Sequence, residues 1–591
     1  MKKLHLLGAT LVALSMTACS EESMTGNEEP VTPPTVTPVG DGGYIAVKIT
    51  NPANSRADED GYATGSEDEN KIDIDNLGFF FFKADGTPFD MTTGTNVNGN
   101  PITSNMICPM YAGNGSSDVS LSSAVLVLGK AVGEGYEGAI PAKMICIANP
   151  DNLADYQNKT LSEVEGIIEE AVVTTNTNGS FVMTSSAYWA NNQKTFWSEI
   201  TSANIKSTPE AAKAAPVQLY VERMAAKVQV KSVANGLVQV AGADNSYSNF
   251  ALTYLDWDAD NNDVKSVTGK NVWAEFSGWN VNTLANKASG IKTISNYSDG
   301  TDKYFTNLTD WNSAERHRCF WATTNSQIDA VNSIKPEQFK ATATANDEQT
   351  LWRGVGADNA RYIFANTSDP FLQGVTDRGN EKFRGKQNFA RSRASKLLVG
   401  VNLSIVDADA TAKSETPFNL LHWGGTYYTP AALCNSIAKL YNLPAGTNVV
   451  MVRGTGSGNK SESDHEQHFN VHFYKSTSLA MGSLVESTQV DHENGAIDSQ
   501  LVAEYWNGMA YYIVNISNDL KATAQSDKEM YGVVRNHIYS YTLQKFIGLG
   551  TPVAAPNQLT DVENPASGET FVAAQLDIVP WRLVEHSTDL E

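Results

Sequence analysis

Short apolar runs that alternate with turn residues extend over almost the whole chain of 591 residues, which contains 44 glycines. Runs of about four to eight residues, bounded by clusters of Gly, Asn, Asp and Ser, are typical of β-strands joined by turns. We therefore expect a mostly β fold, and the length predicts about two to four domains. The clearest candidate strands cover residues 44–49, 72–83, 123–128, 142–148 and a series that starts at Val217.

Two segments show helical signals instead. Thr160 and Glu163 form a capping box ahead of residues 161–171, whose apolar side chains recur on one face. Thr429 is a candidate N-cap for a second helix over residues 430–440, which has proline at its first position. We expect these to be short helices in a chain that is otherwise built from strands.

The N-terminal end has the features of an export signal. Lys2 and Lys3 precede a short apolar run that ends in small residues before Cys19. A membrane-spanning helix needs about 20 apolar residues, so this run is a signal core. A cysteine at the cleavage point resembles the lipobox of bacterial lipoproteins, where the thiol receives a lipid. Ordinary secretion with an incidental cysteine is the alternative.

Two segments of loop-like composition divide the chain. Residues 23–43 are rich in Pro, Thr and Gly and indicate an extended tether. Residues 203–215 look like a connector, and a new strand series follows it, so we place a domain boundary near residue 216. The predicted parts are a signal peptide (1–19), a tether with a propeptide strand (20–56), an N-terminal domain (57–216), and a C-terminal domain with long insertions (217–591) that ends in a strand at about 575–591.

Charge and cysteine usage exclude several classes of partner and site. The chain has 43 basic and 66 acidic residues, a net charge of −23, which argues against nucleic acid as a partner. Four cysteines after Cys19 lie far apart without the CxxC spacing of zinc or redox motifs. Cys146 stands inside an apolar run, where we expect a buried thiol, and the pairing of the cysteines stays open. These four are Cys108, Cys146, Cys319 and Cys434.

No catalytic set stands out in the sequence. His465 and His468 are one residue short of the spacing of the zinc helix motif, and alternation over residues 468–474 predicts a strand. Four aspartates over residues 256–263 resemble the start of a calcium loop, but Asn261 stands where glycine is required. We expect an Asp/Asn-rich hairpin turn there, with an adventitious calcium site as the alternative. We expect no enzyme activity, no cofactor and no metal centre.

A family resemblance becomes visible near the C-terminus. Residues 531–552 read YGVVRNHIYSYTLQKFIGLGTP, which combines RNHxY with GLGxP. This pattern resembles the Bacteroidetes fimbrillin family, which builds type V pili, and within it the major subunits of the short, minor fimbriae most of all. The pieces VERMAAKVQV, GMAYYIVNI and FVMTSS are similar to family segments as well. The motif residues are Arg535, Asn536, His537, Tyr539, Gly548, Gly550 and Pro552.

The resemblance implies a structural protein with two transthyretin-like β-sandwich domains. It implies a lipid (palmitate) on Cys19, a precursor anchored to the outer membrane by that lipid alone, and cleavage between Arg56 and Ala57 by a trypsin-like, arginine-specific protease. The mature chain then joins other copies of itself head to tail in a cell-surface fimbrium with accessory pilus subunits. Adhesion and biofilm formation follow, at a receptor that the sequence leaves undefined.

Residues near the implied cut suit strand exchange on their own physical grounds. Residues 44–49 alternate like a strand with one apolar face, and cutting at Arg56 leaves a groove with unpaired backbone groups. A strand from another copy can fill that groove, and such a contact is heterologous and propagates. We expect residues 576–584 to be the donor, with a break in the ladder at the proline. The displaced apolar residues are Ile45, Val47 and Ile49, and the donor residues are Ile578, Val579, Pro580, Trp581, Leu583 and Val584.

Other functions compete with the fibre shaft. The first is an accessory fimbrial adhesin at the tip or the anchor, with glycan binding near the aromatic residues 421–428. The second is an uncut, monomeric glycan-binding surface lipoprotein, which predicts a mature N-terminus at Cys19. A secreted hydrolase lacks any catalytic constellation in this sequence.

Overall fold

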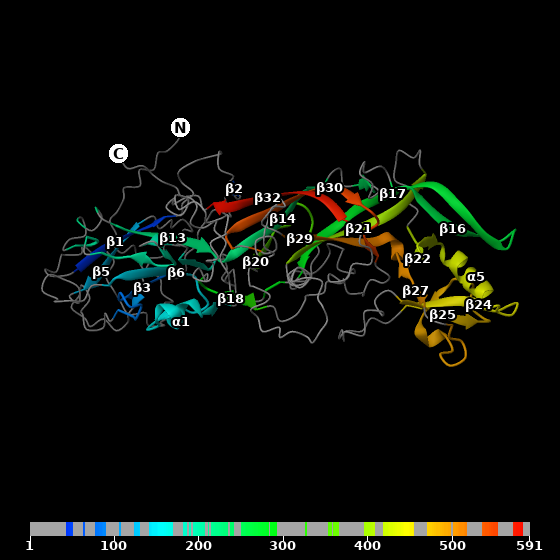
Figure 1. Cartoon of the computed structure of the whole chain (residues 1–591), viewed down its shortest axis with the longest axis horizontal. Helices are drawn as coiled ribbons and strands as arrows, with labels where there is room; N and C mark the ends of the chain where they lie inside the picture. Colours follow the sequence, from blue (N-terminus) through cyan, green and yellow to red (C-terminus); the bar gives the residue numbers. More distant parts are fainter. Residues whose placement is uncertain are drawn as a thin grey trace, which may run out of the picture.

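A computed structural model gives the fold of the chain, which is mostly β with a few short helices (Figure 1). The predicted fold class is confirmed. In Figure 1 the first sheet lies at one end of an elongated molecule, and helix α5 lies at the other end. The structure describes residues 43–50, 63–64, 77–89, 106–107, 123–129, 141–169, 181–185, 188–190, 193–201, 203–206, 211, 214, 216–233, 237–240, 250–282, 284–285, 287–291, 326–327, 353–356, 359–365, 395–407, 418–453, 470–497, 500–516, 533, 535–552 and 571–582.

The first sheet has nine strands among the described residues, seven of them in one continuous order. β11 pairs with β6, and β5 pairs with β1, outside that order. The order is β12 (Ile205–Lys206), β1 (Gly43–Thr50), β13 (Val217–Arg223), β8 (Met183–Ser185), β6 (Lys143–Ala148), β3 (Leu77–Phe82) and β4 (Met106–Ile107), with β11 (Ser198–Glu199) and β5 (Ser123–Gly129) at its sides. A separate hairpin consists of β9 (Tyr188–Ala190) and β10 (Gln193–Thr195).

Helix α1 (Leu161–Glu165) covers one face of β3 and β6. Leu161 and Val164 pack there with side chains of both strands and with Tyr156 of the 3-10 turn η2 (Leu153–Tyr156). The predicted capping box is present, but the predicted helix over residues 161–171 is too long. The chain leaves the helix at Gly166 and continues as strand β7 (Ile168–Glu169), which pairs with a strand far away in sequence.

The chain passes from the first sheet into a second unit at Met224, between β13 and β14. Two sheets pack face to face there around one hydrophobic core, which makes a β-sandwich. The first has the order β2 (Ala63–Thr64), β32 (Phe571–Arg582), β30 (His537–Ile547), β14 (Ala225–Val233) and β20 (Arg361–Phe364). The second has the order β28 (Ala503–Glu504), β22 (Leu421–Trp423), β23 (Thr426–Tyr428), β16 (Leu252–Asp258), β17 (Asp263–Asn282), β21 (Lys396–Asp407), β29 (Met509–Asn515) and β31 (Thr551–Pro552), with β15 (Leu237–Gln239) on β17.

The sandwich core follows the two-residue period of its strands. In β30, Tyr539, Tyr541 and Leu543 enter it, and alternate residues of β21 enter it from the facing sheet. Trp279 of β17 is fully buried and donates from Nε1 to the Gly354 carbonyl at 2.7 Å. Burial of each such large side chain contributes about 1.5–3 kcal/mol.

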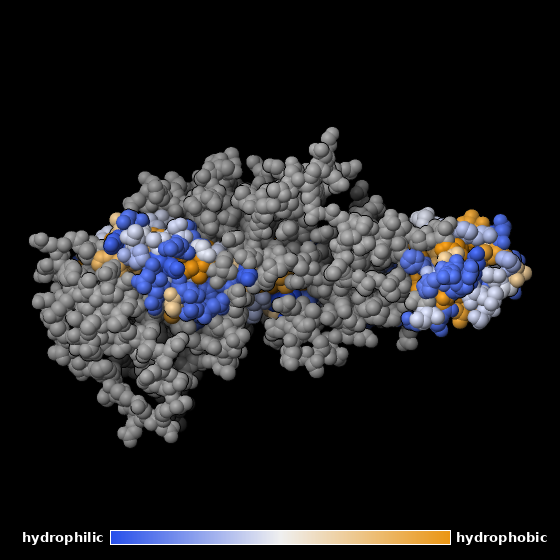
Figure 2. Space-filling view, turned by 90° about the horizontal axis from the view of Figure 1, so that it is seen from below, coloured by the Kyte–Doolittle hydropathy of each residue, from blue (hydrophilic) through white to orange (hydrophobic). Residues whose placement is uncertain are grey.

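A lobe with its own core extends the sandwich at one end. Helix α5 (Pro430–Leu440), capped by Thr429 as predicted, packs on strands β24 and β25. Figure 2 shows hydrophobic residues among hydrophilic ones at this end of the molecule, and Leu440 at the end of α5 is 63% exposed. The lobe sheet has the order β26 (Leu484–Val485), β24 (Asn448–Arg453), β25 (Asn470–Ser476) and β27 (Gln500–Leu501), and the 3-10 turns η6 (Ser487–Gln489) and η7 (Trp506–Gly508) lie nearby in sequence.

A small sheet connects the two units. Its order is β19 (Ser326–Gln327), β18 (Lys287–Ser289) and β7, so a segment of the second unit pairs with a strand of the first. In the register, Ala288 is opposite Glu169, and Ser289 is opposite Ile168. None of the helices in the described part of the chain is both long and apolar enough to cross a membrane.

Candidate functional site

Strand β1 has neighbours on both of its edges. On one edge it pairs antiparallel with β5, from Gly43 opposite Gly129 to Lys48 opposite Ser123. On the other edge it pairs antiparallel with β12 at its start and parallel with β13 from Val47 to Thr50. We call the position of β1, between β5 on one side and β12 with β13 on the other, the acceptor slot.

The residues predicted for lipidation and cleavage lie outside the described residues. Cys19, Arg56 and Ala57 lie there, so lipidation and cleavage remain predictions. The displaced strand predicted at residues 44–49 coincides with β1. Ile45, Val47 and Ile49 stand on it at alternate positions, where backbone pairing is described.

The predicted donor segment coincides in part with β32, which begins earlier than predicted and ends at Arg582. Leu583 and Val584 lie outside the described residues. β32 pairs antiparallel with β30, with Pro580 opposite His537. Its far end pairs parallel with β2, where Ala63 is opposite Trp581. Ile578 and Val579 pair within the β30 ladder as well, opposite Tyr539 and Ile538.

Arg535 of the RNHxY motif is fully buried where the two units meet. Its guanidinium donates from Nη2 to the carbonyl of Ser289 at 2.8 Å and from Nη1 to that of Gly290 at 2.6 Å. Glu222 of β13 lies 3.9 Å from its Nε and is fully buried as well. Burial lowers the pKa of the guanidinium, and the charge of Glu222 opposes that shift. The motif therefore ties the start of β30 to the connecting strand β18 and to a wall of the acceptor slot.

The first unit supplies the other half of this joint. The Tyr156 hydroxyl donates to Oε1 of Glu169 at 2.5 Å, and the Asp151 backbone N–H donates to Oε2 at 2.7 Å. Burial raises the pKa of Glu169 to about 7, although both hydrogen bonds act against that rise. A Cβ added at Gly290 would lie 2.5 Å from the Tyr156 hydroxyl oxygen. The interdomain joint is the set Tyr156, Glu169, Glu222, Ser289, Gly290 and Arg535.

The remaining motif residues shape the backbone around β30. Asn536 has a left-handed φ of 59°, which asparagine tolerates better than most residues. The His537 ring contacts the Arg535 carbonyl through Nδ1 at 2.7 Å, and Tyr539 is fully buried in the sandwich core. Gly548 adopts a φ of 67°, and its carbonyl accepts from the Tyr512 hydroxyl at 2.7 Å. Gly550 has a φ of 72°, and Pro552 pairs with Ala510 across β31 and β29.

Sequence reasoning found Arg535 but not its partners. Four of the joint residues lie far from Arg535 along the chain, and no local sequence pattern marks them as its neighbours. They are Ser289, Gly290, Tyr156 and Glu169. A signal was present for Glu222, because an acidic residue inside an apolar strand pattern indicates a buried charge that needs partners.

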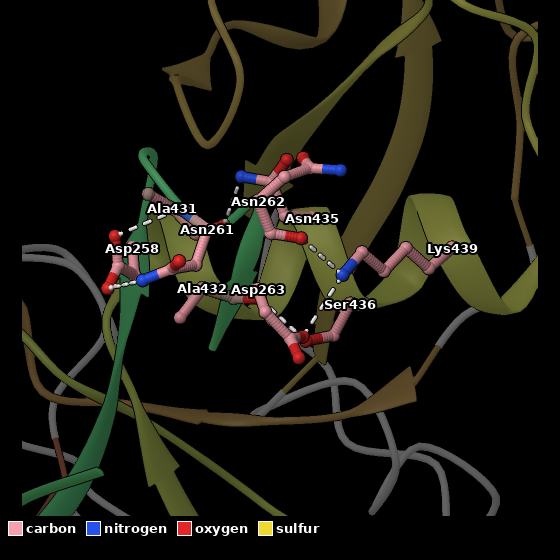
Figure 3. A network of polar contacts seen from close by, with 9 residues as sticks. All are labelled: Asp258, Asn261, Asn262, Asp263, Ala431, Ala432, Asn435, Ser436 and Lys439. Atoms are coloured by element: carbon pink, nitrogen blue, oxygen red, sulfur yellow. Dashed lines mark hydrogen bonds and ion pairs between the residues drawn. The ribbon is translucent and has the colours of Figure 1, made fainter. Parts of the chain in front are cut away.

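The aspartate-rich segment 256–263 forms the predicted hairpin turn between β16 and β17 (Figure 3). Asp258 accepts from the backbone N–H of Asp260 at 3.1 Å and from the side chain of Asn261 at 3.0 Å. Asp263 pairs with Lys439 of α5 at 3.0 Å, and Asp256 accepts from the Thr429 hydroxyl at 3.0 Å. These carboxylates hold the turn against the helix. Among the described residues, no group of three His, Cys, Asp or Glu side chains is placed to hold a metal ion.

The aromatic residues near 421–428 serve packing. Tyr427 packs against the sandwich core, whereas Trp423 and Tyr428 pack against the lobe core. The His422 ring stacks on Tyr427 with centroids 4.5 Å apart. The β22–β23 hairpin thus joins two cores, and its rings are partly buried in them.

Two sequence expectations about single residues are also resolved. Val471 and Phe473 of β25 are buried, and the intervening His472 is only partly so, which confirms the predicted alternation. Cys146 is fully buried with a free thiol, as predicted, and Cys434 is free and buried too.

A comparison with protein families finds a match for the C-terminal part of the chain. Residues 503–587 match the family described as "Major fimbrial subunit protein type IV, Fimbrillin, C-terminal". We call residues 503–587 the fimbrillin segment, after the family that they match. The fimbrillin segment includes Arg535, His537 and all of β32, so the predicted family resemblance is confirmed by an independent match.

Comparisons with solved structures give distant similarities. A fimbrilin (fimA) from Porphyromonas gingivalis is 11% identical, with 92% of this chain and 98% of that chain covered and a TM-score of 0.34. A protein from Parabacteroides distasonis described as a "Putative cell adhesion protein" is 11% identical, with 92% of this chain and 100% of that chain covered and a TM-score of 0.36. The tip fimbrial protein Mfa3 from P. gingivalis is 10% identical, with 91% and 98% covered and a TM-score of 0.27. A comparison with curated proteins gives no match.

Proposed function

We propose that this chain is the major structural subunit of a cell-surface type V pilus and polymerises by donor-strand exchange. Two observations support the proposal together. The C-terminal part matches the fimbrillin C-terminal family, and the strand just before Arg56 occupies an interior position of the first sheet. A cut after Arg56 removes the covalent link between that strand and the rest of the molecule.

The precursor is exported as a lipoprotein and held at the outer membrane by the lipid on Cys19. A trypsin-like protease then cuts between Arg56 and Ala57, in a segment of polar and acidic residues that suits an exposed loop. The membrane anchor and β1 leave together in one fragment. The mature subunit keeps the whole fimbrillin segment.

Loss of β1 leaves unpaired backbone groups on the strands that flanked it, which is a template for strand addition. The C-terminal strand of another copy fills this place. β32 has twelve residues, whereas β1 has eight, so the donor is long enough to replace the whole strand. Each ladder hydrogen bond contributes about 0.5–1.5 kcal/mol, and apolar burial adds to it. The contact is heterologous, so copies propagate into a fibre instead of closing into a dimer.

A shaft role is favoured over a tip role because β32 provides a donor strand, which a tip subunit does not need. Accessory subunits then occupy the ends of the fibre, and adhesion and biofilm formation take place through a surface receptor. The aromatic residues near the β22–β23 hairpin are committed to two cores, so they give the glycan-binding alternative no support.

Replacement of Arg56 tests the proposal. The Arg56→Ala variant, expressed in the native host, is expected to accumulate as a lipidated full-length precursor without fibres. The matched control is Arg378→Ala, which removes an arginine from another polar segment of the sequence and is expected to leave fibres intact. Electron microscopy of the cells and the mass of the surface protein are the readouts. Normal fibres made from Arg56→Ala would overturn the proposal.

A further inference from the structure

The two sides of the acceptor slot are held very differently. On one side, β13 pairs with β8 through Val221, Glu222 and Arg223. Leu219 of β13 is fully buried, and Glu222 lies beside Arg535 in the interdomain joint. The slot-facing residues Val217–Tyr220 continue directly into this paired stretch, so β13 stays attached at that end whether or not β1 is present. The short strand β12 on the same side pairs with β1 alone in the described part of the chain.

On the other side, β5 depends on β1. Its ladder with β1 extends from Ser123 to Gly129, and no other strand in the described part of the chain pairs with it. A strand without a partner exposes its N–H and C=O groups and is not stable by itself in water.

We propose that β5 is a conditional wall of the acceptor slot: it detaches when β1 is removed and re-forms as the antiparallel neighbour of a strand donated by a second copy of this chain. The inference depends on the proposed function, because it needs both the removal of β1 and a donated strand. The incoming strand first pairs parallel with β13, which is fixed, and β5 then closes on its other edge.

A slot with two walls restricts what can enter it. Between Tyr44 and Lys48, β1 has neighbours on both edges. Because successive residues of a strand point their N–H groups to opposite sides, every residue in such a stretch directs its N–H at a wall. A proline anywhere in it loses a ladder bond. In β32 the proline-free part is 571–579, and Pro580 follows it. We assign five consecutive residues within 571–579 to the two-walled stretch, so that Pro580 lies beyond it.

Ordering β5 also has a consequence for the affinity and selectivity of assembly. A wall that folds on binding adds an ordering cost, which reduces the affinity gained per unit of interface. The processed subunit then binds strands that pair with both walls and discriminates against short or proline-containing segments.

A proline scan of the donor peptide distinguishes a slot with two walls from a slot with one wall. The probe is a fluorescent synthetic peptide of residues 571–582, added in excess to the full chain that has been cut by an arginine-specific protease. We expect proline at each of about five consecutive positions to weaken binding roughly tenfold, which corresponds to one lost ladder bond. Alanine at the same positions is the control for side-chain loss. A penalty at alternate positions only would mean a slot with one wall and would overturn the inference.

Hydrogen exchange of β5 provides the second measurement. We expect its amides to be protected in the uncut precursor, to exchange rapidly after the cut, and to regain protection when the peptide binds. Amides of β6, which pairs with β3, β8 and β11 and not with β1, are the internal control and should stay protected throughout. Protection of β5 that does not change on cutting would refute the conditional wall.

The two experiments distinguish a failure of the inference from a failure of the proposed function. In the first outcome, the peptide binds, proline is tolerated at alternate positions, and the protection of β5 does not change on cutting. This outcome is consistent with donor-strand exchange but refutes the conditional wall. Loss of β5 protection on cutting, without binding of any peptide, removes donor-strand exchange from β32 and with it the re-formation of β5 that the inference requires.

Discussion

At the scale of single residues, the interdomain joint shows that the role of a short motif depends on partners far away along the chain. Arg535 donates to the carbonyl of Ser289, the last residue of β18, and to that of Gly290, which follows it. From the first unit, Glu169 of β7 accepts a hydrogen bond from the Tyr156 hydroxyl. Removal of one member of such a buried charged set leaves the others without compensation, which costs about 3–5 kcal/mol. The joint is therefore a sensitive place for single substitutions.

Gly290 is the tightest point of this joint. A Gly290→Ala change places a methyl group 2.5 Å from the Tyr156 hydroxyl oxygen, and the next atom of that ring is 3.6 Å away. We expect it to destabilise the protein by about 1–3 kcal/mol, as overpacking does. The Tyr156→Phe background removes the clashing oxygen, so the same change should cost less there. Urea unfolding of the two single variants and the double variant measures this coupling, and additive effects would contradict it.

Glu169 makes stability depend on pH. Burial raises its pKa from 4.5 to about 7 in the folded chain. Because the folded state holds this proton more tightly, its contribution to stability is fully present below about pH 4.5 and is lost as pH rises through 7. Glu169→Gln, which resembles the neutral acid, should flatten this part of the curve of unfolding free energy against pH. A curve that is unchanged in the variant would mean that another group titrates there.

At the scale of elements, local patterns predict what is local. The capping box at Thr160, the cap at Thr429 and the alternation in β25 all appear in the structure. The helix over residues 161–171 was predicted too long, because pairing of β7 with β18 overrides the helical period after Gly166. No local pattern could assign the parallel partner of β1, since β13 follows it by more than 160 residues. The partners of Arg535 could not be predicted either, because they also lie far from it along the chain.

The cap of α5 tests the link between that helix and the β16–β17 turn. The Thr429 hydroxyl accepts from the Ala432 N–H at 3.3 Å and donates to Asp256 at 3.0 Å. Thr429→Ala should cost about 1 kcal/mol, the usual cost of a lost N-cap. Thr429→Ser keeps the hydroxyl and is the control. Faster hydrogen exchange of the α5 amides in the alanine variant alone is the expected result, and equal rates in both variants would contradict it.

At the scale of the whole molecule, the acceptor slot and β32 belong to different sheets, and the interdomain joint lies between them. β13 is a wall of the slot and carries Glu222, whereas Arg535 leads directly into β30, which precedes β32 along the chain. In a head-to-tail fibre, tension on a subunit therefore passes through this buried joint. The arrangement makes the acceptor slot and the proposed donor strand parts of one connected framework.

Removal of β32 tests the donor assignment. A chain without residues 571–591 should fold, be cut and remain monomeric, because no strand is left to donate. Removal of residues 585–591 alone keeps all predicted donor residues and is expected to leave fibres. Size-exclusion chromatography and electron microscopy report both results. Fibres built from the longer deletion would assign the donor to another segment.

The most direct test of donor-strand assembly is the N-terminal residue of the protein sheared from the surface of its native cells. The account predicts a start at Ala57 in the polymerised fraction, which means that the anchor and β1 have been removed before assembly. A blocked, acylated start at Cys19 in polymerised material would contradict it, because β1 would then still be linked to the subunit whose slot it fills.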